Sequence, residues 1–127
     1  MTDAPRLRQH PEDRFAGPVH HFDLPATAAA LRQEPHHSVG GHRQIALFRR
    51  GPLTLLVFAF EAGGALKEHQ AEGTVTIQTL SGRLTVVVDE ATYELPVGHL
   101  VTLAPGVRHA VLAAEASDML LAVCRES

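Results

Sequence analysis

The sequence predicts an all-β domain, folded as an antiparallel sandwich or barrel, with a short helix before the first strand. From about residue 44 onwards, short runs rich in Val, Leu, Ile, Phe and Thr recur at a spacing of about 8–12 residues. Turn residues separate these runs, as at Gly51-Pro52, Ser81-Gly82 and Pro105-Gly106. Regularly spaced short strands with such turns between them are typical of antiparallel sandwiches and barrels.

The chain before this region divides into an arm and a helix. Residues 1–22 contain three prolines and show no sustained periodicity, so we expect an arm that is ordered only where it docks. Residues 24–34 (LPATAAALRQE) predict a short helix, because Asp23 can cap its N-terminus and Ala and Leu favour helical structure. We therefore divide the chain into an N-terminal arm and short helix over residues 1–39 and a barrel over residues 40–127.

Seven apolar runs predict the strands of the barrel. They are QIALFRR (44–50), LTLLVFAF (53–60), TVTIQTL (74–80), RLTVVVD (83–89), HLVTLA (99–104), RHAVLAA (108–114) and MLLAVC (119–124). Two of them, LTLLVFAF and RLTVVVD, are apolar on both faces of the pleat, which indicates that both faces are covered. We expect one face to meet the barrel interior, and the other to meet a second subunit or the N-terminal arm.

Composition and charge exclude several classes of protein. The chain has 127 residues, enough for one domain, and its 45% apolar and 20% charged residues exclude disorder of the whole chain. A net charge of −3 with no basic stripe argues against a nucleic-acid partner. No run approaches the roughly 20 apolar residues of a membrane span, and we expect no membrane partner.

The single cysteine, Cys124, excludes an intramolecular disulfide and any metal site made of cysteines alone. Because Cys124 ends an apolar run, we expect it to be buried and inert. The first residues also lack the apolar segment of a signal peptide. Together these two features predict a cytoplasmic protein.

The nine histidines are the unusual feature of the composition. Six lie in residues 1–42, where we expect them on the surface of the arm and loop, and His99 directly follows the turn residue Gly98. The two that remain are His69 and His109. Each follows a glycine-containing turn, so we expect each to begin a strand, where side chains converge on the mouth of a barrel.

The segments around these two histidines resemble the two motifs of the cupin superfamily. In GGALKEHQAEGTVTIQTLSG (63–82), His69 occupies the first histidine place of the family's first motif. In GHLVTLAPGVRHAVLA (98–113), His109 occupies the histidine place of the second motif. The resemblance covers about residues 40–125. It implies an RmlC-like jelly-roll barrel, that is, an antiparallel double-stranded β-helix, and a homodimer.

The same resemblance implies a metal site with half of its ligands. In metal-binding cupins, two histidines and a glutamate of the first motif and the histidine of the second bind a divalent metal such as Fe, Mn, Ni or Zn. Here Ala71 stands in the place of the second histidine and Val75 in the place of the glutamate, so only His69 and His109 are left. Two imidazoles alone bind a metal weakly, because catalytic zinc uses three protein ligands and non-haem iron two histidines and a carboxylate.

A third metal ligand would have to come from outside the two motifs' usual ligand places. By simple alternation both Glu72 and Gln78 point away from the histidines, although a bulge could turn Glu72 inward. The loop histidines His36, His37 and His42 could instead fold across the mouth and donate an imidazole.

Three functions are compatible with the sequence. The first is binding of a small organic ligand in a barrel pocket lined by His69, Ala71, Val75, Ile77 and His109, with at most a degenerate metal site. The second is a metal-dependent enzyme of the dioxygenase, isomerase or decarboxylase type, with these histidines as ligands or one of them as a general base. The third is a structural or regulatory module that pairs with itself or with another protein. We favour the first, because the two substitutions exchange metal ligands for pocket volume and an apolar lining.

Overall fold

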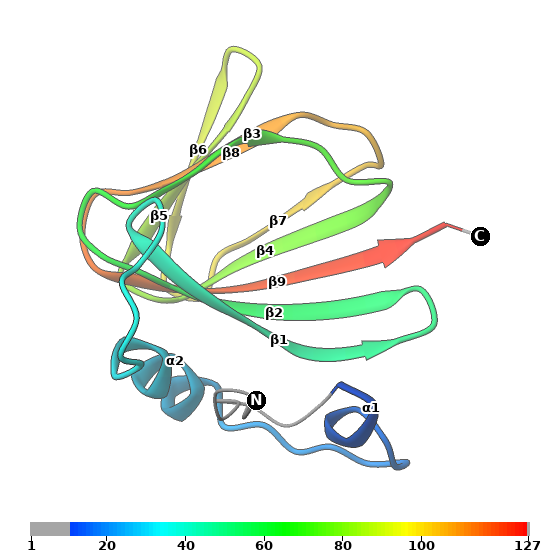
Figure 1. Cartoon of the computed structure of the whole chain (residues 1–127). Coiled ribbons are helices and arrows are strands. Elements are labelled where there is room, and N and C mark those ends of the chain that lie inside the picture. The colour runs from blue at the N-terminus through cyan, green and yellow to red at the C-terminus, as the bar shows by residue number, and fades with distance from the viewer. Residues whose placement is uncertain (1–10, 127) are drawn as a thin grey trace, which may run out of the picture.

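The computed structural model describes residues 11–126, in which two short helices precede nine strands (Figure 1). The helices are α1 (Pro11–Arg14) and α2 (Leu24–Arg32). The strands are β1 (His42–Arg50), β2 (Leu53–Phe60), β3 (Ala65–His69), β4 (Gly73–Ser81), β5 (Arg83–Val88), β6 (Ala91–Pro96), β7 (Leu100–Leu103), β8 (His109–Ala113) and β9 (Ser117–Arg125). Neither described helix is long and apolar enough to cross a membrane.

The strands form two antiparallel sheets that face each other (Figure 1). The larger sheet has the strand order β1-β2-β9-β4-β7, and the smaller has the order β3-β8-β5-β6. Several neighbouring strands are far apart in the chain, since β9 lies between β2 and β4 and β8 lies between β3 and β5. This is the predicted all-β jelly roll, and the expected fold class is confirmed.

All seven expected strands are present, and the structure adds two strands and one helix that the sequence did not predict. The added strands are β3 (ALKEH) and β6 (ATYELP), and the added helix is α1. Four of the six residues of β6 are exposed, so burial leaves little apolar signal in its sequence. Both strands are held by backbone pairing to more apolar neighbours, β3 to β8 and β6 to β5.

Alternate residues of both sheets fill the space between them with one apolar cluster. Its buried members are Phe58, Phe60, Val75, Ile77, Leu84, Val86, Leu95, Leu103, Val111, Ala113, Met119 and Leu121. A fully buried aliphatic or aromatic side chain contributes about 1.5–3 kcal/mol, so this cluster is the main source of stability of the barrel.

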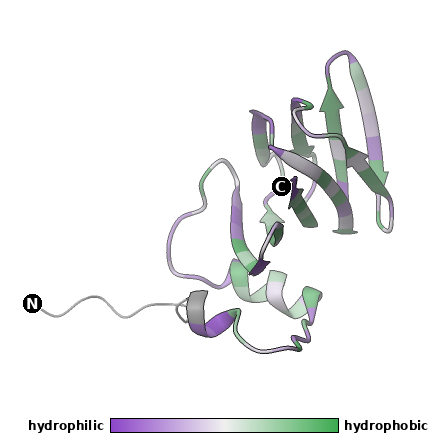
Figure 2. Cartoon of the chain, turned by 90° about the vertical axis from the view of Figure 1, so that its right-hand side faces the viewer, coloured by the Kyte–Doolittle hydropathy of each residue, from purple (hydrophilic) through white to green (hydrophobic). Residues whose placement is uncertain are grey.

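Helix α2 covers the outer face of the larger sheet next to β1 and β2 (Figure 1). The Asp23 side chain caps its first turn and accepts a hydrogen bond from the Ala26 N–H at 3.1 Å, as predicted. Ala28 and Leu31 are buried against apolar residues of both strands, including Val57. Figure 2 shows hydrophobic residues along α2 as well as along most strands. The helix therefore explains why β2 is apolar on both faces. A second subunit is not needed to cover this strand, and the homodimer stays a prediction.

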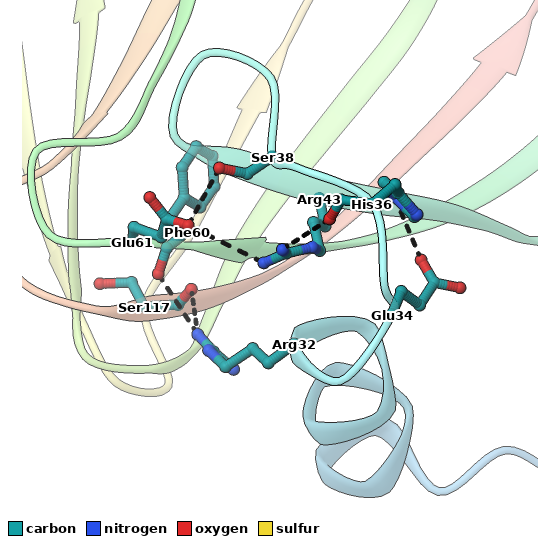
Figure 3. Close-up of polar contacts among 8 residues, drawn as sticks. All are labelled: Arg32, Glu34, His36, Ser38, Arg43, Phe60, Glu61 and Ser117. Atoms are coloured by element: carbon teal, nitrogen blue, oxygen red, sulfur yellow. Dashed lines mark hydrogen bonds and ion pairs between the residues drawn. The ribbon is translucent and has the colours of Figure 1, made fainter.

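Arg32 ties the end of α2 to the barrel (Figure 3). Its guanidinium donates hydrogen bonds to the backbone carbonyls of Phe60, at 3.3 Å, and Ser117, at 3.2 Å. The same group lies 2.6 Å from Oδ1 of Asp118, whose side chain is largely buried. One side chain thus joins the helix to both β2 and β9.

The loop after α2 is held by a second polar network (Figure 3). Arg43 donates a hydrogen bond to the His36 carbonyl at 2.8 Å and lies 3.8 Å from a carboxylate oxygen of Glu61. The Ser38 hydroxyl donates to the same carboxylate oxygen at 2.9 Å. These contacts hold the loop against the end of β2.

The described part of the arm docks along the edge strand β1. Arg14 donates a hydrogen bond at 2.7 Å to the carbonyl of Ala46, beside the irregular register between Ala46 and Phe48. The rings of Phe15 and Phe48 meet edge to face at 6.0 Å, and Arg50 donates to the Phe15 carbonyl. The arm thereby covers part of an edge that would otherwise expose unpaired backbone groups.

The prediction that Cys124 is buried is wrong, because its side chain is exposed. It lies near the end of β9, where Val123 packs against the core and the next side chain points to the opposite face of the sheet. An apolar run indicates a strand, but it does not show that both faces are covered at its end.

Two glycines bring the start of β3 against the loop before β1. A Cβ on Gly41 would lie 2.6 Å from the Cα of Gly64, and a Cβ on Gly64 would overlap the carbonyl oxygen of Gly41. The Gly64 carbonyl accepts a hydrogen bond from the Ala113 N–H at 2.9 Å, and the Gly63 N–H donates to the Ala113 carbonyl at 2.7 Å. The first residues of β3 are thus aligned with the end of β8.

We predict that Gly64→Ala lowers the free energy of unfolding by about 3 kcal/mol or more, because backbone atoms on the facing segment must move. Gly63→Ala is the matched control, since its φ of 83° costs strain of about 1–2 kcal/mol but a Cβ there meets open space. Urea unfolding of the two variants measures the difference. A loss at Gly64 equal to or smaller than that at Gly63 would contradict the close approach of the two segments.

We also predict that Arg32→Met destabilises the protein by about 1–3 kcal/mol, because two carbonyls and a largely buried carboxylate lose their partner. The control is Arg83→Met, which breaks a 3.6 Å ion pair to Glu94 between two half-exposed side chains and should change stability by less than about 1 kcal/mol. Thermal unfolding of both variants tests this. Equal melting temperatures would show that Arg32 does not anchor the helix.

Candidate functional site

The structure brings the two candidate histidines together at one end of the barrel. His69 and His109 are paired across β3 and β8, and their ring centroids lie 4.2 Å apart with the rings tilted by 57°. His109 begins β8 as expected, but the expectation that His69 begins a strand is wrong, because His69 ends β3. Antiparallel pairing places the end of one strand opposite the start of the other, so both rings still meet.

A β-bulge determines which residue of β3 lies opposite His109. Between Leu66 and His69, β3 contains one residue more than the facing part of β8. In a regular ladder, Glu68 would stand opposite His109. In the structure Glu68 lies on the surface instead, where its carboxylate accepts a hydrogen bond from Arg108 at 2.8 Å. Simple alternation along the sequence does not reveal this shift.

Hydrogen bonds to backbone carbonyls orient both imidazoles. Nδ1 of His109 lies 3.0 Å from the Val107 carbonyl oxygen, and Nδ1 of His69 lies 2.9 Å from that of Lys67. A carbonyl oxygen only accepts, so Nδ1 carries the hydrogen in each ring. In a neutral imidazole the other nitrogen, Nε2, then has a free lone pair.

Nε2 of His109 is a buried nitrogen without a partner. His109 is only 1% exposed, and no group in the described part of the chain forms a hydrogen bond with this atom. Burial lowers the pKa of His109 below its usual value of 6.5; the Val107 carbonyl opposes this shift and the neighbouring His69 adds to it. His109 is therefore neutral at pH 7 and has an unused acceptor.

Two apolar residues, Ala71 and Val107, each lie two positions from one of the histidines in the sequence. The Gly106 N–H donates to the Ala71 carbonyl at 2.9 Å, which brings the loop after β3 against the turn before β8. Ala71 and Val107 are partly buried and pack against the core. Val75 and Ile77 belong to that core and are 3% and 0% exposed. Of the five predicted site residues, three thus lie at the end of the barrel and two lie inside it.

The expected third metal ligand is not supplied by Glu72 or His42. No group of three or more His, Cys, Asp or Glu residues that could hold a metal occurs among the residues that the structure describes. Glu72 is exposed and lines a separate surface cavity of about 430 Å³ together with Pro52, Arg125 and Glu126. His42 packs instead against two core phenylalanines, with ring centroids 5.5 Å apart.

The remaining candidates for a third ligand also lie elsewhere. His36 and His37 are exposed in the loop, and Nε2 of His36 lies 3.6 Å from Glu34. Gln78 pairs with Leu100 and Leu120 and lies on the face opposite the buried residues of β4. Two imidazoles do not fit the three-ligand centres of zinc or non-haem iron enzymes, and we derive no chemistry through a metal.

Comparison with known proteins places this geometry in a family. Residues 56–124, which include both histidines, match the family model of the cupin domain. Among curated proteins, no match was found.

Several solved structures share the fold. A conserved protein of unknown function from Streptococcus pyogenes, SPY1581, is 28% identical, with a TM-score of 0.65 over 71% of this chain and 79% of that chain. A cupin superfamily protein from Desulfitobacterium hafniense is 17% identical, with a TM-score of 0.71 over 89% and 99%. Salicylate 1,2-dioxygenase from Pseudoaminobacter salicylatoxidans is 19% identical, with a TM-score of 0.71 over 81% of this chain and 32% of that chain.

At these identities, the likeness to the second and third structures shows a shared fold only. The family match is broader evidence, since it covers more than half of the chain and contains both strands that bring the histidines together. The chain belongs to the cupin superfamily.

Proposed function

We propose that this protein binds a small organic molecule at the end of the barrel where His69 and His109 meet, and that binding needs no metal. The observation that carries the proposal is the partnerless Nε2 of His109. Leaving a buried polar group without a hydrogen bond costs about 1–3 kcal/mol. A bound ligand would supply the missing partner.

The composition of this end of the barrel supports the proposal. Small-molecule sites are mostly apolar, with a few polar groups that orient the ligand. Here Ala71 and Val107, each two positions from one of the histidines in the sequence, pack against the apolar core, and Ala71 and Val75 occupy places where metal-binding members of the family have ligands. Both substitutions remove metal-binding groups and keep the lining apolar.

The test is a fragment screen on untagged protein freed of metal by a chelator. We expect fragments that bind the wild type to bind His69→Ala and His109→Phe at least about tenfold more weakly, a loss equivalent to one good hydrogen bond. His99→Phe is the matched control, because His99 is an exposed residue after a turn and should leave binding unchanged. Ligand-observed NMR measures the affinities, and circular dichroism confirms that each variant folds.

The alternative function is that of a metal-dependent enzyme. A measurement on the same untagged protein distinguishes it from the proposed function. Elemental analysis of untagged wild type would then find a stoichiometric divalent metal that disappears in His69→Ala. That result, with fragments binding only the metal-loaded protein, would contradict the proposal.

A further inference from the structure

We infer that the ligand of this site is a neutral molecule that donates a hydrogen bond from a hydroxyl or N–H group on an apolar body, and that it is not an anion. This inference rests on the proposed function and names the chemical class of its ligand.

The two ring nitrogens of each histidine differ in hydrogen-bonding character. The carbonyls of Lys67 and Val107 take the Nδ1 hydrogens of His69 and His109. In its neutral form, a ring held in this way offers only a lone pair, on Nε2. A ligand that contacts these nitrogens must bring the hydrogen itself, as an alcohol, a phenol or an amide N–H does.

The charges close to the pair in the sequence disfavour an anionic ligand. Beside neutral imidazoles, a carboxylate or phosphate would present lone pairs to lone pairs, and burying it without a cation is costly. Two cations lie within two residues of the pair in the sequence. Arg108 already has a partner in Glu68, and the side chains of both are more than half exposed. Lys67 is exposed as well. Neither of these two described cations is therefore a buried counter-charge for an anion.

The apolar residues close to the pair in the sequence favour an apolar body for the rest of the ligand. Ala71 and Val107, each two positions from one of the histidines in the sequence, pack against the core, and Leu66 on β3 just before the bulge packs against the same core. Contact with such side chains favours an apolar body. The polar requirement of the ligand is thus one donor group, and the remainder is hydrocarbon.

Two matched sets of probes test the inference. One set is phenol, anisole and benzoate, and the other is cyclohexanol, methoxycyclohexane and cyclohexanecarboxylate. Within each set the body is constant, while the polar group is a donor, an acceptor only, or an anion. Dissociation constants are measured on metal-free wild type, and NMR of histidine-labelled protein reports contact with the Nε2 atoms of His69 and His109.

We expect each alcohol to bind at least about tenfold more tightly than its ether, and each carboxylate to bind more weakly than both. The alcohol should shift the Nε2 signal of His109, and its advantage over the ether should vanish in His109→Phe but persist in His99→Phe. Carboxylates that bind most tightly, or ethers that bind as well as alcohols, would overturn the ligand class while the proposed function stands. If no probe disturbs either histidine, the proposed function fails together with the ligand class.

Discussion

The antiparallel pairing of β3 with β8 is the constraint on which the site depends. It places the last residue of one strand, His69, opposite the first residue of the other, His109. The close approach of Gly41 and Gly64 aligns the other end of this pair of strands, and the bulge after Leu66 then sets the final register. Without the bulge, Glu68 instead of His69 would lie opposite His109.

Much of the fold could be predicted from the sequence, because burial leaves a visible apolar pattern. The seven apolar runs all became strands, and the helix capped by Asp23 lies where it was expected. The two missed strands show the limit of this reasoning. β3 and β6 contain few buried side chains, so their own sequences carry little apolar pattern. They are strands because they pair with more apolar neighbours, β8 and β5.

The site could be predicted in part, and the missing part has a physical reason. The glycine and histidine spacing pointed to His69 and His109, and the structure brings them together. The sequence could not decide whether Glu72 or His42 completes a metal site, because that depends on loop paths and packing. The sequence also could not show that Nδ1–H of each ring donates a hydrogen bond to a backbone carbonyl. That hydrogen bond depends on the backbone conformation two residues before each histidine. That conformation makes the pair an acceptor.

The claim that His69 and His109 act as hydrogen-bond acceptors is tested most directly by measuring which ring nitrogen carries the hydrogen in the ligand-free, metal-free protein. Nitrogen NMR of protein labelled in its histidine rings reports this position at a pH above the usual titration range of histidine. The account predicts that His69 and His109 both carry hydrogen on Nδ1 and a bare lone pair on Nε2. Hydrogen on Nε2 of either ring would contradict it, because that histidine would then donate to the ligand and could not accept.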